Sequence, residues 1–400
     1  MANIVDSCFK ENLRYLLFCN NRSAGENADC LDDAFEEALK QSVFLFIYEL
    51  KKFSLAKADI EKWENAYLSQ IANNIRNQVA HQELHKLLSE TGIDYVILKG
   101  MASAKYYPDP LLRTMGDVDF LVKKSDVDRT VELLNDNGYE QRKEDNHSFH
   151  TAFKRAMITY ELHWSCPGVP REGKEGDCVR EYLADIIEKA ECFDGYMVPS
   201  DFHHGLVLLL HSASHMTTTG MGLRHLCDWA VFSNKFSDSE FCDLFKEPLK
   251  EMGLWEYARV LTAVSIKYLG IDRKLWAEGV EEETVDLIMQ DILDSGNFGV
   301  KDNQRINQAK LMRDDATRGV ARGGPIKTLI RNLNVRSKRV MPITNKIPVL
   351  LPIGWVYVGV KHLTQIKAGK RSSINVAKTI RGAEKRSSLY SRLKLFEGER

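Results

Sequence analysis

The sequence predicts an α+β fold, in which a small mixed sheet follows an N-terminal helical layer and precedes a C-terminal helical bundle. Short apolar, β-branched runs cluster in the segment 91–165, whereas apolar residues recur at helical spacing in 31–53, 60–88 and 201–300. An apolar content of 44% is enough for packed cores. We therefore expect four regions: a helical region (1–90), a sheet domain (91–165), a helical domain (166–300) and a basic tail (301–400).

The first strand of the sheet is expected where the run 95–104 (YVILKGMASA) begins. Lys99-Gly100 ends the apolar part and leads into small, helix-tolerant residues, a pattern typical of a strand, a tight turn and a helix N-terminus. Backbone N–H groups at such a terminus bind anions, and Lys99 adds a charge for a phosphate. Alternatively, Lys-Gly is only a common strand–helix turn.

The strongest chemical signal is Asp117 and Asp119 in the run 115–122 (MGDVDFLV). Carboxylates are depleted in strands, yet these two lie on one face of a predicted strand, with Cα atoms about 6.5–7 Å apart. Mg²⁺ is held by one or two carboxylates plus substrate phosphates, so the pair predicts a magnesium site. The proline-containing loop before it brings Arg113 close enough to contact a polyphosphate or to pair with the aspartates. The alternative is a strand end with two solvated acids.

A helix is predicted over 127–134, ending at Asn137-Gly138, and strands are predicted at 148–153 and 157–164. In the last strand, Glu161 and His163 share the face opposite the core residues. Glu161 is therefore a candidate third carboxylate, which takes a proton from an attacking hydroxyl or completes a metal sphere. The alternative is an exposed Glu and His on a half-solvated strand.

The helical domain carries His211 and His215, four residues apart on one helical face, followed by Arg224 and Asp228. A His-x-x-x-His pair binds zinc in some proteins, but the Glu of a His-Glu-x-x-His protease is absent because Ser212 follows His211. We expect structural histidines or histidines that line a cleft. Arg224 and Asp228 are spaced to pair along their helix.

Together these residues resemble the nucleotidyltransferase superfamily built on a DNA polymerase β-like palm, and most closely its bacterial branch of uncharacterised nucleotidyltransferases. The resemblance covers about residues 85–235. The matching pieces are Leu98-Lys99-Gly100, the loop from Tyr107-Pro108 to Arg113, Gly116 to Val122, Gly138-Tyr139, Glu161 to Trp164, and the helical block 208–229.

The resemblance implies that Asp117 and Asp119 bind one or two Mg²⁺ ions, with Mn²⁺ as a substitute, and that Glu161 assists them. It also implies that Lys99, Gly100 and Arg113 hold a nucleoside triphosphate such as ATP. The side chains expected to shape an acceptor cleft are those of His163, His211, His215, Arg224 and Asp228. The wider superfamily has Gly-Ser at the nucleotide-binding turn, where this chain has Lys99-Gly100.

The implied reaction is in-line attack of an acceptor hydroxyl on the α-phosphorus of the triphosphate, with release of pyrophosphate. The expectation is a bacterial, Mg²⁺-dependent nucleotidyltransferase that acts on an unknown hydroxyl acceptor, in surface-glycan or envelope biosynthesis. The alternative is a catalytically degenerate nucleotide-binding regulator, or a membrane-associated scaffold, on the same fold.

The charge distribution sets the tail apart from the rest of the chain. Residues 301–400 carry 23 basic and 6 acidic side chains, a net charge of +17, so residues 1–300 carry −18. The stretch 347–360 is uncharged but is too short for a spanning helix and contains two prolines. It is expected either to lie on an anionic membrane surface or to dock against the acidic body; nucleic acid is the least favoured partner because no aromatic residues alternate with the basic ones.

Cysteine usage and the N-terminal sequence predict a cytoplasmic location. The tail would add a peripheral contact with the inner face of the membrane. The eight cysteines form no Cys-x-x-Cys pair, which is typical of reduced thiols, and the N-terminus lacks the pattern of a signal peptide.

Overall fold

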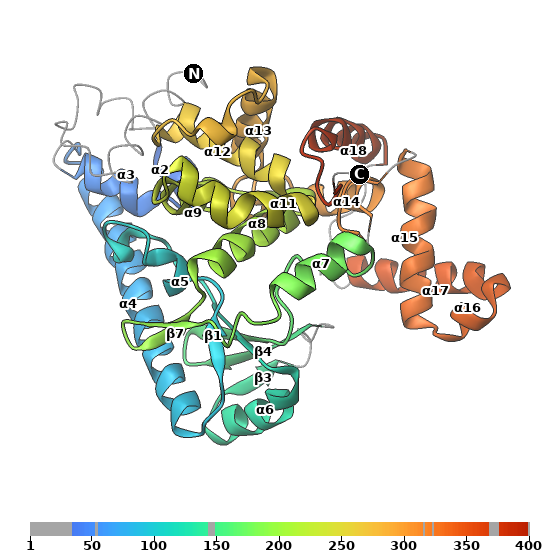
Figure 1. Cartoon of the computed structure of the whole chain (residues 1–400), viewed down its shortest axis with the longest axis horizontal. Helices are drawn as coiled ribbons and strands as arrows, with labels where there is room; N and C mark the ends of the chain where they lie inside the picture. Colours follow the sequence, from blue (N-terminus) through green and yellow to red (C-terminus); the bar gives the residue numbers. More distant parts are fainter. Residues whose placement is uncertain are drawn as a thin grey trace.

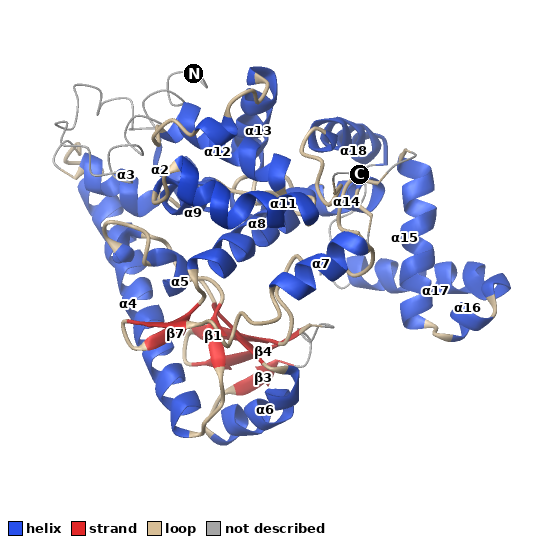
Figure 2. Ribbon diagram, in the orientation of Figure 1, coloured by secondary structure: helices blue, strands red, loops and turns tan. Residues whose placement is uncertain are grey.

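A five-stranded mixed sheet lies at one end of the molecule and helices make up the remainder (Figures 1 and 2). The computed structural model describes residues 34–52, 55–142, 149–314, 317–321, 324–367 and 376–398. The strand order is β1-β2-β5-β4-β3; β2 and β5 are parallel, and the other neighbours are antiparallel. The strands are β1 (Tyr95–Ile97), β2 (Val118–Val122), β3 (Glu140–Arg142), β4 (His150–Arg155) and β5 (Ile158–His163). The predicted α+β class is confirmed.

The alternation of side chains along β2 gives the sheet two buried faces. Val118, Phe120 and Val122 pack into one core with Leu84 and Leu88 of helix α4 (Ile60–Glu90). The opposite face contributes Val96, Leu98 and Leu121 to a second core shared with the helical region. Asp119 lies between these apolar positions on the second face, so its carboxylate points toward the helices.

The N-terminal helical prediction is confirmed for the described residues, with one break. Helices α2 (Ala34–Lys40) and α3 (Phe44–Lys51) are separated at Gln41, and α4 then runs for 31 residues behind the sheet. Helix α6 (Val127–Asp136) ends at Asn137-Gly138 as predicted, and Gly138 has a positive φ of 78°.

The helical domain follows the sheet as α7 (Lys174–Tyr182), α8 (Asp201–Thr217), α9 (Leu223–Asn234), α10 (Asp238–Phe241), α11 (Glu247–Glu251), α12 (Trp255–Leu269) and α13 (Glu282–Ser295). A hairpin of β6 (Glu191–Phe193) and β7 (Tyr196–Val198) precedes α8 and was not predicted. Its turn is Asp194-Gly195, with φ values of 48° and 81°, the conformation that tight hairpins favour.

Two helices of the basic tail pack into the body. Helices α14 (Arg305–Met312) and α18 (Val376–Ser391) contact each other, and Arg386 donates hydrogen bonds to the carbonyls of Met216 and Thr218 at 2.9 and 3.0 Å. Arg305 pairs with Asp291 at 2.7 Å. This part of the tail therefore docks on the helical domain.

The rest of the tail forms an arm that projects away from the body, with α15 (Pro325–Val340), α16 (Ile343–Lys346) and α17 (Leu351–Lys367) (Figure 1). The stretch 347–360 packs on α15, where the indole N–H of Trp355 donates to Asn334 Oδ1 at 2.9 Å, rather than on the acidic body. Its other side is solvent-exposed at Val349, Ile353, Val356, Tyr357 and Val360. Among the described residues no helix combines the length and apolarity needed to cross a bilayer.

Candidate active site

One cavity of about 260 Å³ lies between the sheet and helices α8 and α9. It gathers side chains from the strand–helix turn after β1, from β2 and β5, and from both helices. The site residues expected from the sequence all line it: Lys99, Gly100, Arg113, Asp117, Asp119, Glu161, His163, His211, His215, Arg224 and Asp228.

Three carboxylates converge on one side of the cavity. Asp119 and Glu161 are partners in the parallel pairing of β2 with β5, and Asp117 lies just before β2. Each contributes an oxygen, and these oxygens lie within 4.8 Å of one another. Asp119 is buried, Glu161 is partly exposed and Asp117 is exposed. Glu161 therefore lies beside the two aspartates, as the strand alternation predicted.

Lys99 and His163 hold the buried carboxylate of Asp119. Lys99 Nζ lies 2.9 Å from Asp119 Oδ2, and His163 Nε2 lies 3.0 Å from Oδ1 and 3.3 Å from Glu161 Oε2. His163 is buried, so the alternative of an exposed strand histidine is wrong. Burial alone would lower the pKa of Lys99 and of His163, but the neighbouring carboxylates outweigh it and raise both values. Burial would raise the pKa of Glu161, but the hydrogen bond from His163 outweighs it and the net shift is downward.

The turn after β1 is tight because Gly100 adopts a conformation that other residues avoid. Its φ is +63°, and a Cβ there would lie 3.2 Å from Nε2 of His81, a buried residue of α4. Helix α5 (Met101–Ala104) is a single turn, so Lys99, rather than a long helix, supplies the positive charge at this point.

Replacing Gly100 with alanine is expected to lower the free energy of unfolding by about 1–3 kcal/mol, because of the left-handed backbone and the contact with His81. Gly92 has a similar φ of +66° but open space around it, so Gly92→Ala is a control for backbone strain alone. Urea unfolding followed by circular dichroism measures both variants. Equal losses of unfolding free energy in the two variants would show that the contact of the new Cβ with His81 adds nothing to the destabilisation.

Arg113 is bound to a partner that was not expected. Its Nε and Nη2 each lie 2.7 Å from an oxygen of Asp228 on α9, and the hydroxyl of Tyr107 donates to the same carboxylate at 2.7 Å. All three residues are buried. The pairing of Arg113 with Asp117 or Asp119, one of the two roles that the sequence left open, is therefore wrong for the described structure, and so is the pairing of Arg224 with Asp228. Arg224 instead donates to the carbonyl of Thr114 at 3.2 Å and lies over the ring of Phe298.

Asn74 on α4 holds the loop that carries Arg113, and sequence reasoning missed it. Its Nδ2 donates to the carbonyls of Leu111 and Arg113 at 2.7 and 2.9 Å, and its Oδ1 accepts from the backbone N–H of Met115 at 3.0 Å. These three bonds fix the backbone immediately before Asp117. An asparagine on a polar helix gives no sequence signal for such a role.

A second set of possible metal ligands lies on the helical side of the cavity. His211 and His215 of α8 meet His225 of α9, and their ring nitrogens lie within 4.8 Å of one another. His225 was not predicted, because the contact joins two helices. Within the described parts of the chain, both of its ring nitrogens are buried and have no hydrogen-bond partner. Burial lowers the pKa of all three histidines, that of His215 to about 3, and so favours the neutral, metal-binding form.

A family model described as "Uncharacterised nucleotidyltransferase" matches residues 28–270, more than half of the chain. The chain belongs to this family. No curated protein matches the chain at a significant level. Membership supports nucleotidyl transfer as the general activity and a nucleoside triphosphate as the substrate, and the mixed sheet is consistent with a nucleotidyltransferase fold.

The carboxylates of this nucleotidyltransferase fit a divalent cation. Asp117, Asp119 and Glu161 offer oxygen ligands within 4.8 Å of one another, and Mg²⁺ prefers oxygen. Lys99 binds one oxygen of Asp119 and His163 the other, while exposed Asp117 and partly exposed Glu161 line the cavity. The donor set thus suits magnesium or manganese better than a soft metal.

Proposed function

We propose that this protein is a Mg²⁺-dependent nucleotidyltransferase that moves a nucleoside monophosphate from a triphosphate to a hydroxyl-bearing acceptor. The observation that carries the proposal is the convergence of Asp117, Asp119 and Glu161 with Lys99 in one cavity. A bound metal pair would neutralise charge on the attacking and leaving oxygens. Mn²⁺ would fit the same oxygen ligands.

The residues of the chain have separate roles in the proposed transfer. The acceptor oxygen forms a bond to the α-phosphorus as the bond to the pyrophosphate oxygen breaks, and Glu161 takes the acceptor proton. Lys99 neutralises Asp119 before the nucleotide binds and lies close enough to its phosphates to share their charge. Gly100 allows the backbone turn that places Lys99. Arg113 is held by Asp228 and lines the side of the cavity proposed for the nucleotide.

The acceptor cleft is proposed on the helical side of the cavity. His211, His215 and Arg224 line the cavity from the helices, and His163 lines it from the sheet beside Asp119. The neutral histidines offer hydrogen bonds to the reacting hydroxyl of an acceptor without adding charge. Such an acceptor is consistent with a role in surface-glycan or envelope assembly at the cytoplasmic face of a membrane.

The test is incubation of the full chain with each α-³²P-labelled nucleoside triphosphate, Mg²⁺ and a cell extract. We expect label in a small molecule or protein, together with pyrophosphate release, and loss of both in Asp117→Asn. Label transfer that survives this substitution would contradict the metal assignment.

A second candidate is a regulator that binds a nucleotide without transferring it. The observation in its favour is that both Asp119 oxygens are already paired, with Lys99 and His163, and that Lys99-Gly100 replaces the Gly-Ser of the wider superfamily. Retention of labelled nucleotide without pyrophosphate release in the same assay would select this alternative.

The arm is proposed as a peripheral contact with an anionic membrane. Five exposed apolar side chains of the stretch 347–360 follow helical spacing on one side, and basic residues such as Arg336, Lys338 and Arg339 lie on neighbouring α15. This combination suits the interface of an anionic bilayer.

Replacing Val356 and Tyr357 with aspartate is expected to weaken binding to phosphatidylglycerol-containing vesicles at least tenfold, because burying each apolar side chain contributes about 1.5–3 kcal/mol. Val79→Asp, an exposed position on α4, is the matched control. Point variants are preferable to removal of the tail because α18 is part of the body. Vesicle sedimentation that is equal for wild type and arm variant would remove the membrane proposal.

A further inference from the structure

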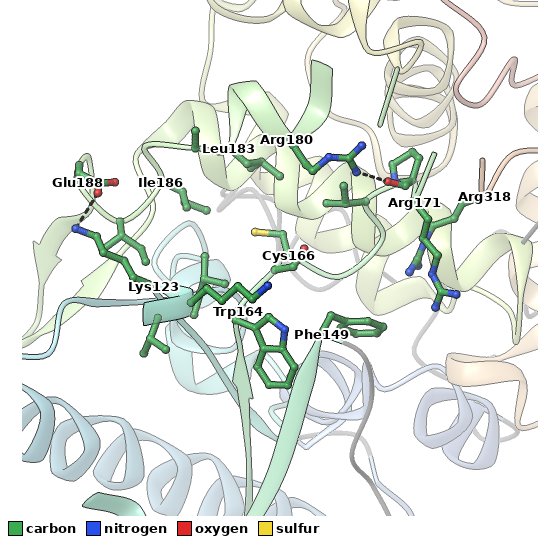
Figure 3. Close-up of a pocket in the computed structure, with 18 of the residues that line it drawn as sticks. Lys123, Phe149, Trp164, Cys166, Arg171, Arg180, Leu183, Ile186, Glu188 and Arg318 are labelled. Carbon is green, nitrogen blue, oxygen red and sulfur yellow. Dashed lines mark hydrogen bonds and ion pairs between the residues drawn. The ribbon is translucent and has the colours of Figure 1, made fainter. Parts of the chain in front are cut away.

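A larger cavity, of about 770 Å³, adjoins the candidate active site (Figure 3). It is lined by the end of β2, by the segment 164–171 that follows β5, by α7 and the turn after it, and by Arg318 and Arg339 from the tail. Phe149 lines both cavities. The volume lies in the range of about 300–1,000 Å³ that small-molecule sites occupy.

The two cavities follow one another along the same face of the sheet. On β2, Asp119 faces the smaller cavity and Leu121, two residues later, faces the larger one. On the neighbouring chain segment, His163 faces the smaller cavity and Ser165 the larger one. Two residues of a strand span about 6.5–7 Å. A molecule seated in the larger cavity therefore needs to extend only a few bonds to reach the carboxylates.

The walls of the larger cavity are apolar. Trp164, Val169, Leu183 and Ile186 contribute side chains to it, and the close-up view shows Leu183 and Ile186 on the far side of Cys166 from Trp164 (Figure 3). These residues offer a surface for an alkyl chain or a ring rather than for a sugar, since few of them carry hydrogen-bonding groups.

The charged side chains around it are nearly all basic. Six cationic residues and one acid line the cavity: Lys123, Lys124, Arg171, Arg180, Arg318, Arg339 and Glu188. Lys123 is paired with Glu188 at 2.9 Å, and Arg180 with Asp177 at 2.6 Å. Arg171 and Arg318 both line the cavity and are drawn at the same end of it (Figure 3). This excess of positive charge favours an anionic ligand.

We propose that the larger cavity holds the body of the acceptor, and that the acceptor is an amphiphilic organic anion: an alkyl or aryl chain that carries a phosphate or carboxylate group as well as the reacting hydroxyl. The inference rests on the proposed nucleotidyl transfer for its chemical step. In that step the hydroxyl oxygen bonds to the α-phosphorus, pyrophosphate leaves with the electrons of the broken P–O bond, and the hydroxyl proton passes to Glu161; nothing is oxidised or reduced.

The chemical class of the ligand is tested by isothermal titration calorimetry of the full chain, without nucleotide or metal. The four ligands are decyl phosphate (below its micellisation concentration), decanoate, decanol and inorganic phosphate. We expect saturable binding of decyl phosphate or decanoate at one site, at least tenfold tighter than that of decanol or phosphate. The stronger of the two anions identifies the head group. Equal binding of all four, or none, would overturn the proposal.

The variant Lys124→Glu/Arg171→Glu changes two exposed cations that line the cavity and lie outside the buried cores. It is expected to weaken decyl phosphate binding at least tenfold and to leave decanol unchanged, whereas Trp164→Ala weakens both. Lys86→Glu, an exposed position on α4, is the control. Competition between ATP and decyl phosphate would assign the cavity to the nucleotide and reject it as an acceptor site.

The experiments distinguish rejection of the acceptor cavity from rejection of the proposed transferase activity. If label transfer in an extract survives Lys124→Glu/Arg171→Glu and Trp164→Ala, the transferase stands and the acceptor cavity is rejected. If decyl phosphate binds as expected, also to Asp117→Asn, but no triphosphate yields transfer, the ligand class stands and the proposed reaction is rejected.

Discussion

Replacing Asp117 with asparagine is expected to lower metal-dependent transfer about 10²–10³-fold, while the free energy of unfolding changes by no more than about 0.5 kcal/mol. The carboxylate is exposed and forms no ion pair within the described residues, so the fold does not depend on its charge. Its removal takes away an oxygen ligand from the metal, and losing even one group that stabilises transition-state charge costs about 10²–10³-fold in rate.

The measurement is label transfer over a range of Mg²⁺ concentrations, with urea unfolding of the same preparations. Asp136→Asn, an exposed carboxylate on α6, is the matched control and should behave as wild type in both assays. More than a tenth of the wild-type rate in Asp117→Asn would reject Asp117 as a metal ligand.

Asp119→Asn should be equally inactive but also less stable. Its carboxylate is 1% exposed and is bound to Lys99 and His163, whose side chains are 16% and 2% exposed. Asparagine leaves Lys99 and His163 with a weaker partner, and breaking a buried ion pair such as that of Lys99 with Asp119 costs about 3–5 kcal/mol. Comparison of the two aspartates therefore separates loss of a metal ligand from loss of structure.

A loss of stability as large as that of Asp119→Asn is expected at Asp228. Asp228→Asn should lower the free energy of unfolding by about 3–5 kcal/mol, because Arg113 would stay buried with its bidentate partner weakened and Tyr107 would lose a charged acceptor. Burial lowers the pKa of an arginine, but Asp228 outweighs burial and keeps the pKa of Arg113 above its usual value, so Arg113 stays charged. Glu247→Gln, from an exposed pair with Lys250, should cost no more than about 1 kcal/mol.

The double variant Arg113→Met/Asp228→Leu distinguishes the pair from the packing around it. Removing both charges together should restore much of the stability lost in Asp228→Asn, because no unpaired cation remains. If the double variant is as unstable as the single one, the ion pair does not account for the loss. In the folded double variant, a higher KM for the triphosphate with unchanged kcat would indicate that Arg113 contributes to nucleotide binding.

The strand pattern was sufficient to predict the carboxylate cluster but not its neighbours. Asp117, Asp119 and Glu161 were found because alternation along a strand is a local property, and parallel pairing of β2 with β5 then brought them together. Asn74, Arg113 with Asp228, and His225 depend on contacts between elements distant in sequence, which periodicity does not encode. The β6–β7 hairpin was missed although Asp194-Gly195 is a turn signal, because its strands are only three residues long.

The arm illustrates a different limit. Composition identified the basic tail and its apolar stretch, yet the same charge excess is divided between α18, which docks on the body, and α15–α17, which project from it. Net charge describes the whole tail. Docking of α18, in contrast, depends on single contacts such as the hydrogen bonds from Arg386 to backbone carbonyls.

The contact between α18 and α8 also has a consequence for biosynthesis. Arg386 caps the end of the helix that carries His211 and His215, and it does so through the carbonyls of Met216 and Thr218. On the ribosome, some 170 residues must be added after α8 before this guanidinium emerges. The helical wall of the cavity is therefore completed late in translation.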